Sequence, residues 1–137
     1  IAATMADLYP RTGYAQLAAM AAAKAAFDSG NLAEARARLQ WAADRAKDDA
    51  TRDLARLRLA MVLVDEKKPD EALTALQGAP VEAMTALFAD ARGDILAAQQ
   101  KTADARSAYQ LALDKSDAKS PYRSVIQGKL ESLGETR

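Results

Sequence analysis

The sequence of 137 residues contains no cysteine and no histidine. These two absences exclude a thiol nucleophile, a Ser-His-Asp triad, and zinc sites built from thiolate or imidazole ligands. We therefore expect a protein that is not an enzyme, with no catalytic residue, no metal and no cofactor.

Residues that favour strands are also scarce, since valine and isoleucine together number seven, whereas alanine alone numbers 34. Alanine has the highest intrinsic helix propensity, and β-branched residues are the ones enriched in strands. The composition therefore predicts an all-α fold. A chain of this length is expected to form a single domain, 1–137, with a core that needs no disulfide.

No charge of either sign is in excess, because 19 lysines and arginines face 19 aspartates and glutamates. A protein that binds nucleic acid usually carries a basic excess, since neutralising phosphates supplies much of its affinity. We therefore expect no nucleic-acid partner.

No run approaches the ~20 apolar residues of a membrane-spanning helix. The chain begins at Ile1 and not at a methionine. We therefore expect a processed chain or one that lacks its N-terminus, and a signal or membrane anchor removed with those residues would leave no trace in this sequence.

Small residues recur with a repeated spacing. The gaps of 12, 4 and 3 residues are found in three sets: Ala23, Ala35, Leu39 and Ala42; Ala60, Ala72, Leu76 and Ala79; Gly93, Ala105, Tyr109 and Ala112. The sets are separated by 37 and then 33 residues, close to the ~34-residue period of tetratricopeptide (TPR) repeats. In such a repeat, small residues let paired helices cross closely, and the large residue fills the space between neighbouring pairs. The spacing predicts a TPR-like helical repeat of about three helix pairs with a C-terminal capping helix.

Turn residues divide this pattern into helices. Asn31 and Glu34 are spaced as in a capping box, Pro69 suits a first helical turn, and Thr102 is the predicted cap of a later helix. Together these signals predict a short helix within 1–9 (2–8), repeats at 13–47, 51–79 and 81–116, and a capping helix at 121–133. The helices within the repeats are expected at 13–28, 32–47, 51–66, 70–77, 81–99 and 103–115.

Six segments carry a resemblance to a known family. They are Tyr9-Pro10-Arg11-Thr12-Gly13-Tyr14-Ala15, Ser29-Gly30-Asn31-Leu32-Ala33-Glu34-Ala35, Leu57-Arg58-Leu59-Ala60, Ala91-Arg92-Gly93-Asp94-Ile95, Ala103-Asp104-Ala105-Arg106-Ser107-Ala108-Tyr109, and Lys129-Leu130 with Leu133. In this order and spacing they resemble YfgM-type ancillary subunits of the SecYEG translocon, from about residue 9 onward.

The resemblance implies a bacterial inner-membrane protein with one N-terminal span, absent from this chain, and a helical domain on the periplasmic side. It also implies protein partners: the SecYEG translocon, a PpiD-type chaperone and exported chains. The function expected is a protein–protein interaction module that links export to periplasmic chaperones. An alternative is a periplasmic TPR scaffold or lipoprotein-type adaptor in envelope or outer-membrane assembly. A span before Ile1 would favour the first function, and a lipidated cysteine the second.

The first helix of each pair is expected to line the concave, partner-binding face of the repeat. Mobile thioethers and a phenyl ring at these positions suit varied apolar segments. The candidate residues are Leu17, Met20, Lys24, Phe27, Leu57, Met61, Val64, Leu87, Asp90 and Asp94. Simple packing of one repeat on the next is the competing interpretation for each of them. Trp41, the only tryptophan, is expected on the opposite, convex side with its ring against a neighbouring helix.

Overall fold

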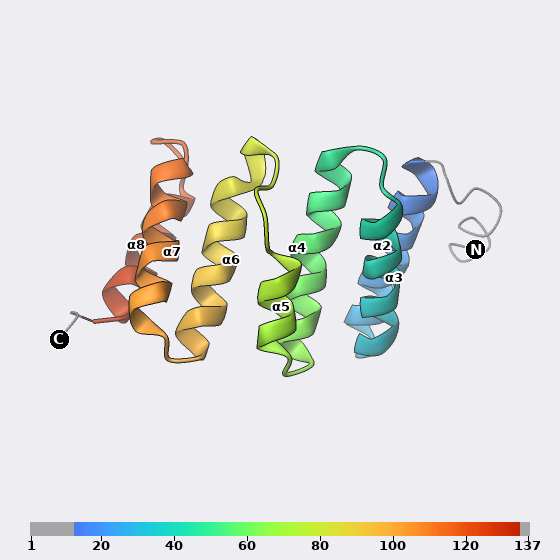
Figure 1. Ribbon diagram of the computed structural model, residues 1–137, viewed down its shortest axis with the longest axis horizontal. Coiled ribbons are helices and arrows are strands. Elements are labelled where there is room, and N and C mark those ends of the chain that lie inside the picture. Colours follow the sequence, from blue (N-terminus) through green and yellow to red (C-terminus); the bar gives the residue numbers. More distant parts are fainter. Residues whose placement is uncertain (1–12, 135–137) are drawn as a thin grey trace. The chain divides into compact units, whose positions relative to one another are not determined.

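The computed structural model describes residues 13–134 of the chain. These residues form seven α-helices and one short 3-10 helix, and they contain no strand (Figure 1). The all-α fold that the composition predicts is confirmed. The helix predicted at 2–8 lies outside the described residues.

Contacts divide the helices between two compact units, one ending at Gln77 and the other beginning at Gly78. Unit 1 contains α2 (Gly13–Asp28), α3 (Leu32–Arg45), α4 (Asp49–Asp65) and α5 (Pro69–Ala75). Unit 2 contains η1 (Glu82–Met84), α6 (Thr85–Ala98), α7 (Thr102–Lys115) and α8 (Tyr122–Ser132). Within unit 1, α2 packs on α3 and α4 lies between α3 and α5, while in unit 2 α7 packs on both α6 and α8 (Figure 1).

One capping side chain and one proline begin helices where the sequence predicts. The Asn31 side-chain oxygen accepts a hydrogen bond from the Glu34 amide at 3.3 Å, and the Asn31 amide group donates to the Glu34 carboxylate at 3.1 Å. Pro69 is the first residue of α5, where its missing N–H leaves no helical bond unmade. The predicted cap at Thr102 is wrong: Thr102 is already helical, and Lys101 precedes it without a capping side chain.

The helix predicted at 81–99 is also corrected, because it is divided into η1 and α6. Val81 and Met84, which precede these two helices, provide no side-chain hydrogen bond to the free amides that follow. Uncapped first turns often tighten into 3-10 geometry, which satisfies amides over a shorter span. The α-helix therefore begins at Thr85.

The small-residue columns form the centre of the helix contacts. Eleven of the twelve positions are buried: Ala23, Ala35, Leu39, Ala42, Ala60, Ala72, Leu76, Gly93, Ala105, Tyr109 and Ala112. Ala79 is the exception and is exposed. Helix α5 ends at Ala75, and Gly78 has a φ of +84°, so the chain has already left the helix at Ala79.

In the third repeat, a different pair of side chains fills the contact between the two paired helices. Two repeats pair an alanine with a leucine (Ala23 with Leu39, Ala60 with Leu76), whereas the third pairs Gly93 with Tyr109. A Cβ added at Gly93 would lie 2.5 Å from two ring carbons of Tyr109. The larger ring therefore occupies the volume that the missing methyl group leaves.

We predict that Gly93→Leu destabilises the protein by about 2 kcal/mol or more, because overpacking displaces the Tyr109 ring. Gly93→Ala should also destabilise, although alanine favours a helix by about 1 kcal/mol over glycine. Adding Tyr109→Leu to Gly93→Ala rebuilds the alanine–leucine pair and should recover part of that loss. Urea denaturation of the single and double variants measures the coupling.

Gly128 provides the matched control, because it lies inside α8 and an added Cβ there would meet no atom within 4 Å. Gly128→Ala should therefore leave stability unchanged or raise it by up to about 1 kcal/mol. Strictly additive losses at Gly93 and Tyr109 would show that the two side chains do not share one space.

Candidate protein-binding surfaces

An apolar groove of about 320 Å³ lies in unit 1 between α2 and α4. Residues of α2 that are three or four positions apart form one wall of the groove. Helix α4 forms the other wall, and Leu39 of α3 lies at the floor. The lining residues are Met20, Ala23, Lys24, Phe27, Asp28, Leu39, Arg58, Met61 and Val62.

The groove has a buried floor and an accessible rim. Met20 is 3% exposed and belongs to the core, Phe27 is partly buried, and Met61 is 57% exposed. An exposed thioether beside a phenyl ring is an adaptable apolar contact, because methionine is unbranched and polarizable. A ligand side chain entering here would contact Phe27 and Met61 without any change in the core.

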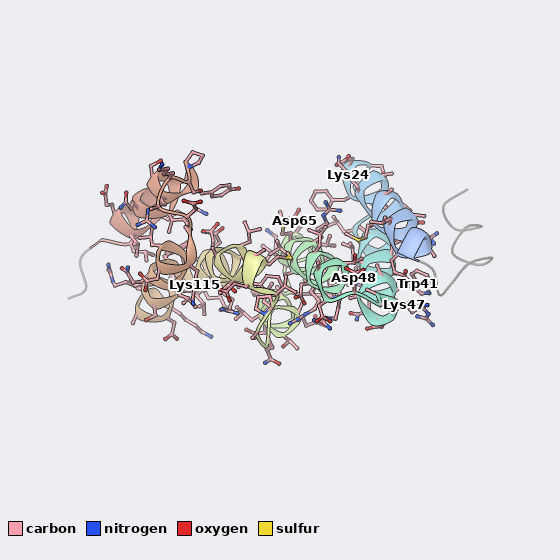
Figure 2. The ribbon with its side chains drawn as sticks, turned by 90° about the horizontal axis from the view of Figure 1, so that it is seen from above. Lys24, Trp41, Lys47, Asp48, Asp65 and Lys115 are labelled. Atoms are coloured by element: carbon pink, nitrogen blue, oxygen red, sulfur yellow. The ribbon has the colours of Figure 1, made fainter. Side chains whose placement is uncertain are left out.

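Charged groups border the groove at two places. The Lys24 ammonium and the Asp28 carboxylate pair at 2.9 Å on the outer surface of α2. Arg58 of α4 borders the other side and is exposed, and its guanidinium makes no ion pair or hydrogen bond with any described residue. Figure 2 shows Lys24 on a different side of unit 1 from Trp41.

The ten candidate residues are thus divided by the structure. Met20, Lys24, Phe27 and Met61 meet at the groove. Leu17, Leu57 and Val64 lie outside its lining; Leu17 is 59% exposed and Val64 is 37% exposed. Leu87, Asp90 and Asp94 belong to α6 in unit 2 and are described with that unit.

In unit 2, a lysine of α8 occupies the face of α6 that carries the two candidate aspartates. The Lys129 ammonium lies 2.9 Å from the Asp90 carboxylate and 3.1 Å from that of Asp94. The Tyr109 hydroxyl donates to Asp94 at 2.6 Å, and the ammonium lies 5.8 Å from the centre of the Tyr109 ring. These four residues, which we call the Lys129 clamp, tie α6, α7 and α8 together.

Helix α8 covers the end of the α6–α7 pair through its apolar face. Ile126 is buried, and Leu130 and Leu133 pack against the same core cluster. Tyr122 and Val125 of the same helix are half exposed, at 53% and 51%. Tyr122 borders a smaller cavity of about 190 Å³ that Leu87 and Asp90 also line.

The environment of the clamp displaces the pKa values of two members. Burial raises the pKa of Tyr109 above its ordinary 10.0, and the hydrogen bond to Asp94 and the charges of Asp94 and Asp90 raise it further. Burial alone would lower the pKa of Lys129, but hydrogen bonds and charges from the two aspartates outweigh it and raise the pKa. Both groups therefore hold their protons more tightly than in an unfolded chain.

A second groove, which the sequence did not predict, lies on the Trp41 side of unit 1. It encloses about 820 Å³, and Trp41, Leu59, Leu63 and Thr74 are among the residues that line it. Trp41 is partly buried, and the guanidinium of Arg45 lies 5.2 Å from the centre of its ring. The tryptophan is thus covered by an arginine one turn later in its own helix.

An ionic network around one buried aspartate lies beside this second groove, at the C-terminal end of α5. Asp53 is fully buried and pairs with Arg52 at 3.3 Å and Arg56 at 3.2 Å. Arg56 also donates to the backbone carbonyls of Ala75, at 2.9 Å, and Gln77. These carbonyls lie at the C-terminal end of α5, where a helix leaves acceptors unmatched, so Arg56 stabilises the early end of α5.

Within residues 13–134, no cluster of three or more potential acidic, histidine or cysteine ligands could hold a metal ion. No helix in that part of the chain is long and apolar enough to cross a membrane.

Stacked helix pairs with small-residue crossings and an apolar groove define a helical-repeat protein, a class that builds binding surfaces from neighbouring repeats. The model of the tetratricopeptide repeat-like domain family matches residues 1–135. The chain belongs to this family.

Two curated relatives are similar along most of the chain. The ancillary SecYEG translocon subunit of Neisseria gonorrhoeae (strain ATCC 700825 / FA 1090) is 40% identical over 126 residues, which cover 91% of this chain and 60% of the relative. The ancillary SecYEG translocon subunit of Escherichia coli (strain K12) is 32% identical over 120 residues, 88% of this chain and 58% of the relative. The chain therefore spans about three fifths of the length of these relatives. No solved structure matches it.

We predict that the stability of unit 2 falls as the pH rises above 10.0, the ordinary pKa of tyrosine. An unfolded chain loses the Tyr109 and Lys129 protons at their ordinary values, whereas the folded chain retains them to higher pH. The folded state then binds more protons, so the free energy of unfolding decreases with rising pH.

Thermal unfolding followed across the alkaline range measures this slope. Tyr109→Phe removes one of the two raised groups, so the variant should show a shallower decline than the parent protein. Equal slopes in both proteins would contradict a clamp that retains the tyrosine proton.

Proposed function

We propose that this chain is the periplasmic domain of an inner-membrane ancillary subunit of the SecYEG translocon, and that it acts by binding proteins and not by catalysis. The observation that carries the proposal is the 40% identity to a subunit so named, extending over 91% of the chain. Both relatives have the same name. This favours the translocon over a scaffold for envelope or outer-membrane assembly.

The proposed partners are the SecYEG translocon, a PpiD-type periplasmic chaperone and exported chains. The α2–α4 groove supports a role in binding, because Met61 is largely exposed and Phe27 is only partly covered. Apolar side chains that line an open groove remain in contact with water until a partner covers them. Polar or charged sites alone would not suit the apolar segments of incompletely folded proteins.

The groove is large enough to contribute useful affinity. Burying one leucine- or phenylalanine-sized side chain contributes about 1.5–3 kcal/mol. Two or three such contacts contribute about 3–9 kcal/mol before the entropy lost on association is subtracted, so binding by the groove alone is expected to be weak. Transient contacts of this strength are suited to a subunit that releases its partners.

We predict that Met61→Asp weakens the binding of an apolar peptide or of the partner domain at least tenfold, without loss of helix content. The exposed side chain can accept a carboxylate in the free protein, whereas a bound apolar segment would bury that charge. Phe27→Asp should weaken binding similarly with a larger loss of stability, since Phe27 is partly buried. Fluorescence anisotropy and a melting curve on the same samples give the two quantities.

Leu17→Asp is the matched control, because Leu17 is equally exposed on α2 but lies outside the groove. Its binding should equal that of the parent protein. Loss of fold in Met61→Asp would assign the residue to the core, and unchanged binding in a folded variant would remove the groove from the proposal.

We predict that a photo-cross-linking residue at position 61 in the intact protein captures a translocon subunit or the chaperone in living cells. The same probe at position 47, on a different side of unit 1 from Lys24 (Figure 2), should capture them less. Cross-links that form only from segments outside this domain would contradict a role of the repeats in the association.

A further inference from the structure

Arg58 is placed beside the apolar groove without a charged neighbour on its own helix. Residues three and four positions away share a helix face and are the usual ion-pair partners. At Arg58 these positions hold Leu54, Ala55, Met61 and Val62, all of them apolar. No described residue from another helix supplies a carboxylate, since Arg58 makes no ion pair.

Two other basic residues of unit 1, on the helices that form the groove, are paired with carboxylates of their own helices. Lys24, which also lines the groove, pairs with Asp28, and Arg52 of α4 pairs with Asp49 and Asp53. The Lys24–Asp28 pair contributes no net charge to the groove. The remaining charge at its border is therefore the single positive charge of Arg58.

We infer that the segment bound in this groove is an apolar protein segment carrying a carboxylate beside its apolar side chain, with that carboxylate against Arg58. The inference rests on the proposed function and adds the chemistry of the partner. The apolar side chain is buried between Phe27 and Met61, and the guanidinium receives a carboxylate from an adjacent aspartate or glutamate. A segment with lysine or arginine at that place would meet repulsion.

The charge of Arg58 is expected to affect which segment binds, and in which direction, more than it affects the affinity. An exposed ion pair changes affinity only about threefold, because water and salt screen it. A single fixed charge at one border of an apolar groove nevertheless favours one direction of a bound segment over the other. We expect the preference to shrink in high salt, whereas apolar binding persists.

The experiment uses three fluorescein-labelled peptides with the same apolar core. The core is followed by glutamates in the first peptide, by glutamines in the second and by lysines in the third. The intact chain should bind the glutamate peptide about threefold or more tighter than the lysine peptide. Arg58→Glu should invert this order, and Arg58→Gln should abolish it. Lys47→Glu makes the same change in net charge on a different side of the unit from the groove residue Lys24 (Figure 2) and should keep the order of the parent protein.

The outcomes separate this inference from the proposed function. Equal binding of all three peptides, abolished by Met61→Asp, would overturn the carboxylate preference and leave the groove as the binding site. Binding that Met61→Asp does not change would overturn the groove itself. Self-association that sedimentation velocity detects and Met61→Asp abolishes would make the occupant a second copy of this chain, and would also overturn the inference.

Discussion

The close crossing of paired helices is the constraint on which both units depend. Ala35, Ala72 and Ala105 are each fully buried at the start of the second helix of a pair. A methyl group is the largest side chain that permits such an approach, and a larger one would separate the helices. Small residues occupy the crossing points, larger side chains such as Leu39, Leu76 and Tyr109 are buried beside them, and further apolar side chains lie at the margins of these contacts. The groove between α2 and α4 is one such margin, with Met61 at its rim.

This constraint explains why so much of the fold is readable in the sequence. Spacings of three and four residues identify one helix face, and a repeated gap of twelve links the two helices of a pair. The same logic places Met20, Lys24 and Phe27 on one stripe of α2, and the structure brings them to one groove. Leu17 continues that stripe by one turn, but the groove ends before it. Periodicity therefore predicts which face of a helix lines a groove, but it does not predict at which residue the groove ends.

Contacts between distant residues could not be predicted in this way. Lys129 reaches aspartates 35 and 39 positions earlier, and nothing in the spacing of either helix indicates which lysine fills that place. Arg56 is similar, since its carbonyl partners lie 19 and 21 positions later. From the sequence, Arg56 and Asp53 resemble an ordinary surface ion pair within one helix. In the structure Asp53 is buried, and its pair with Arg56 holds the guanidinium against the end of α5. Long flexible side chains such as lysine and arginine can reach several different partners, so the sequence alone does not determine which partner each one contacts.

The glycine–tyrosine pair of the third repeat has a consequence for the evolutionary route between the two kinds of pair. A lineage passing from alanine–leucine to glycine–tyrosine must change two positions, and its intermediate depends on which changes first. If the alanine first becomes glycine, the intermediate has a small cavity and loses some helix propensity, a modest penalty. If the leucine first becomes tyrosine, the ring collides with the methyl group across the helix crossing. On a route from an alanine–leucine pair to this one, glycine at position 93 would therefore precede the aromatic ring at position 109.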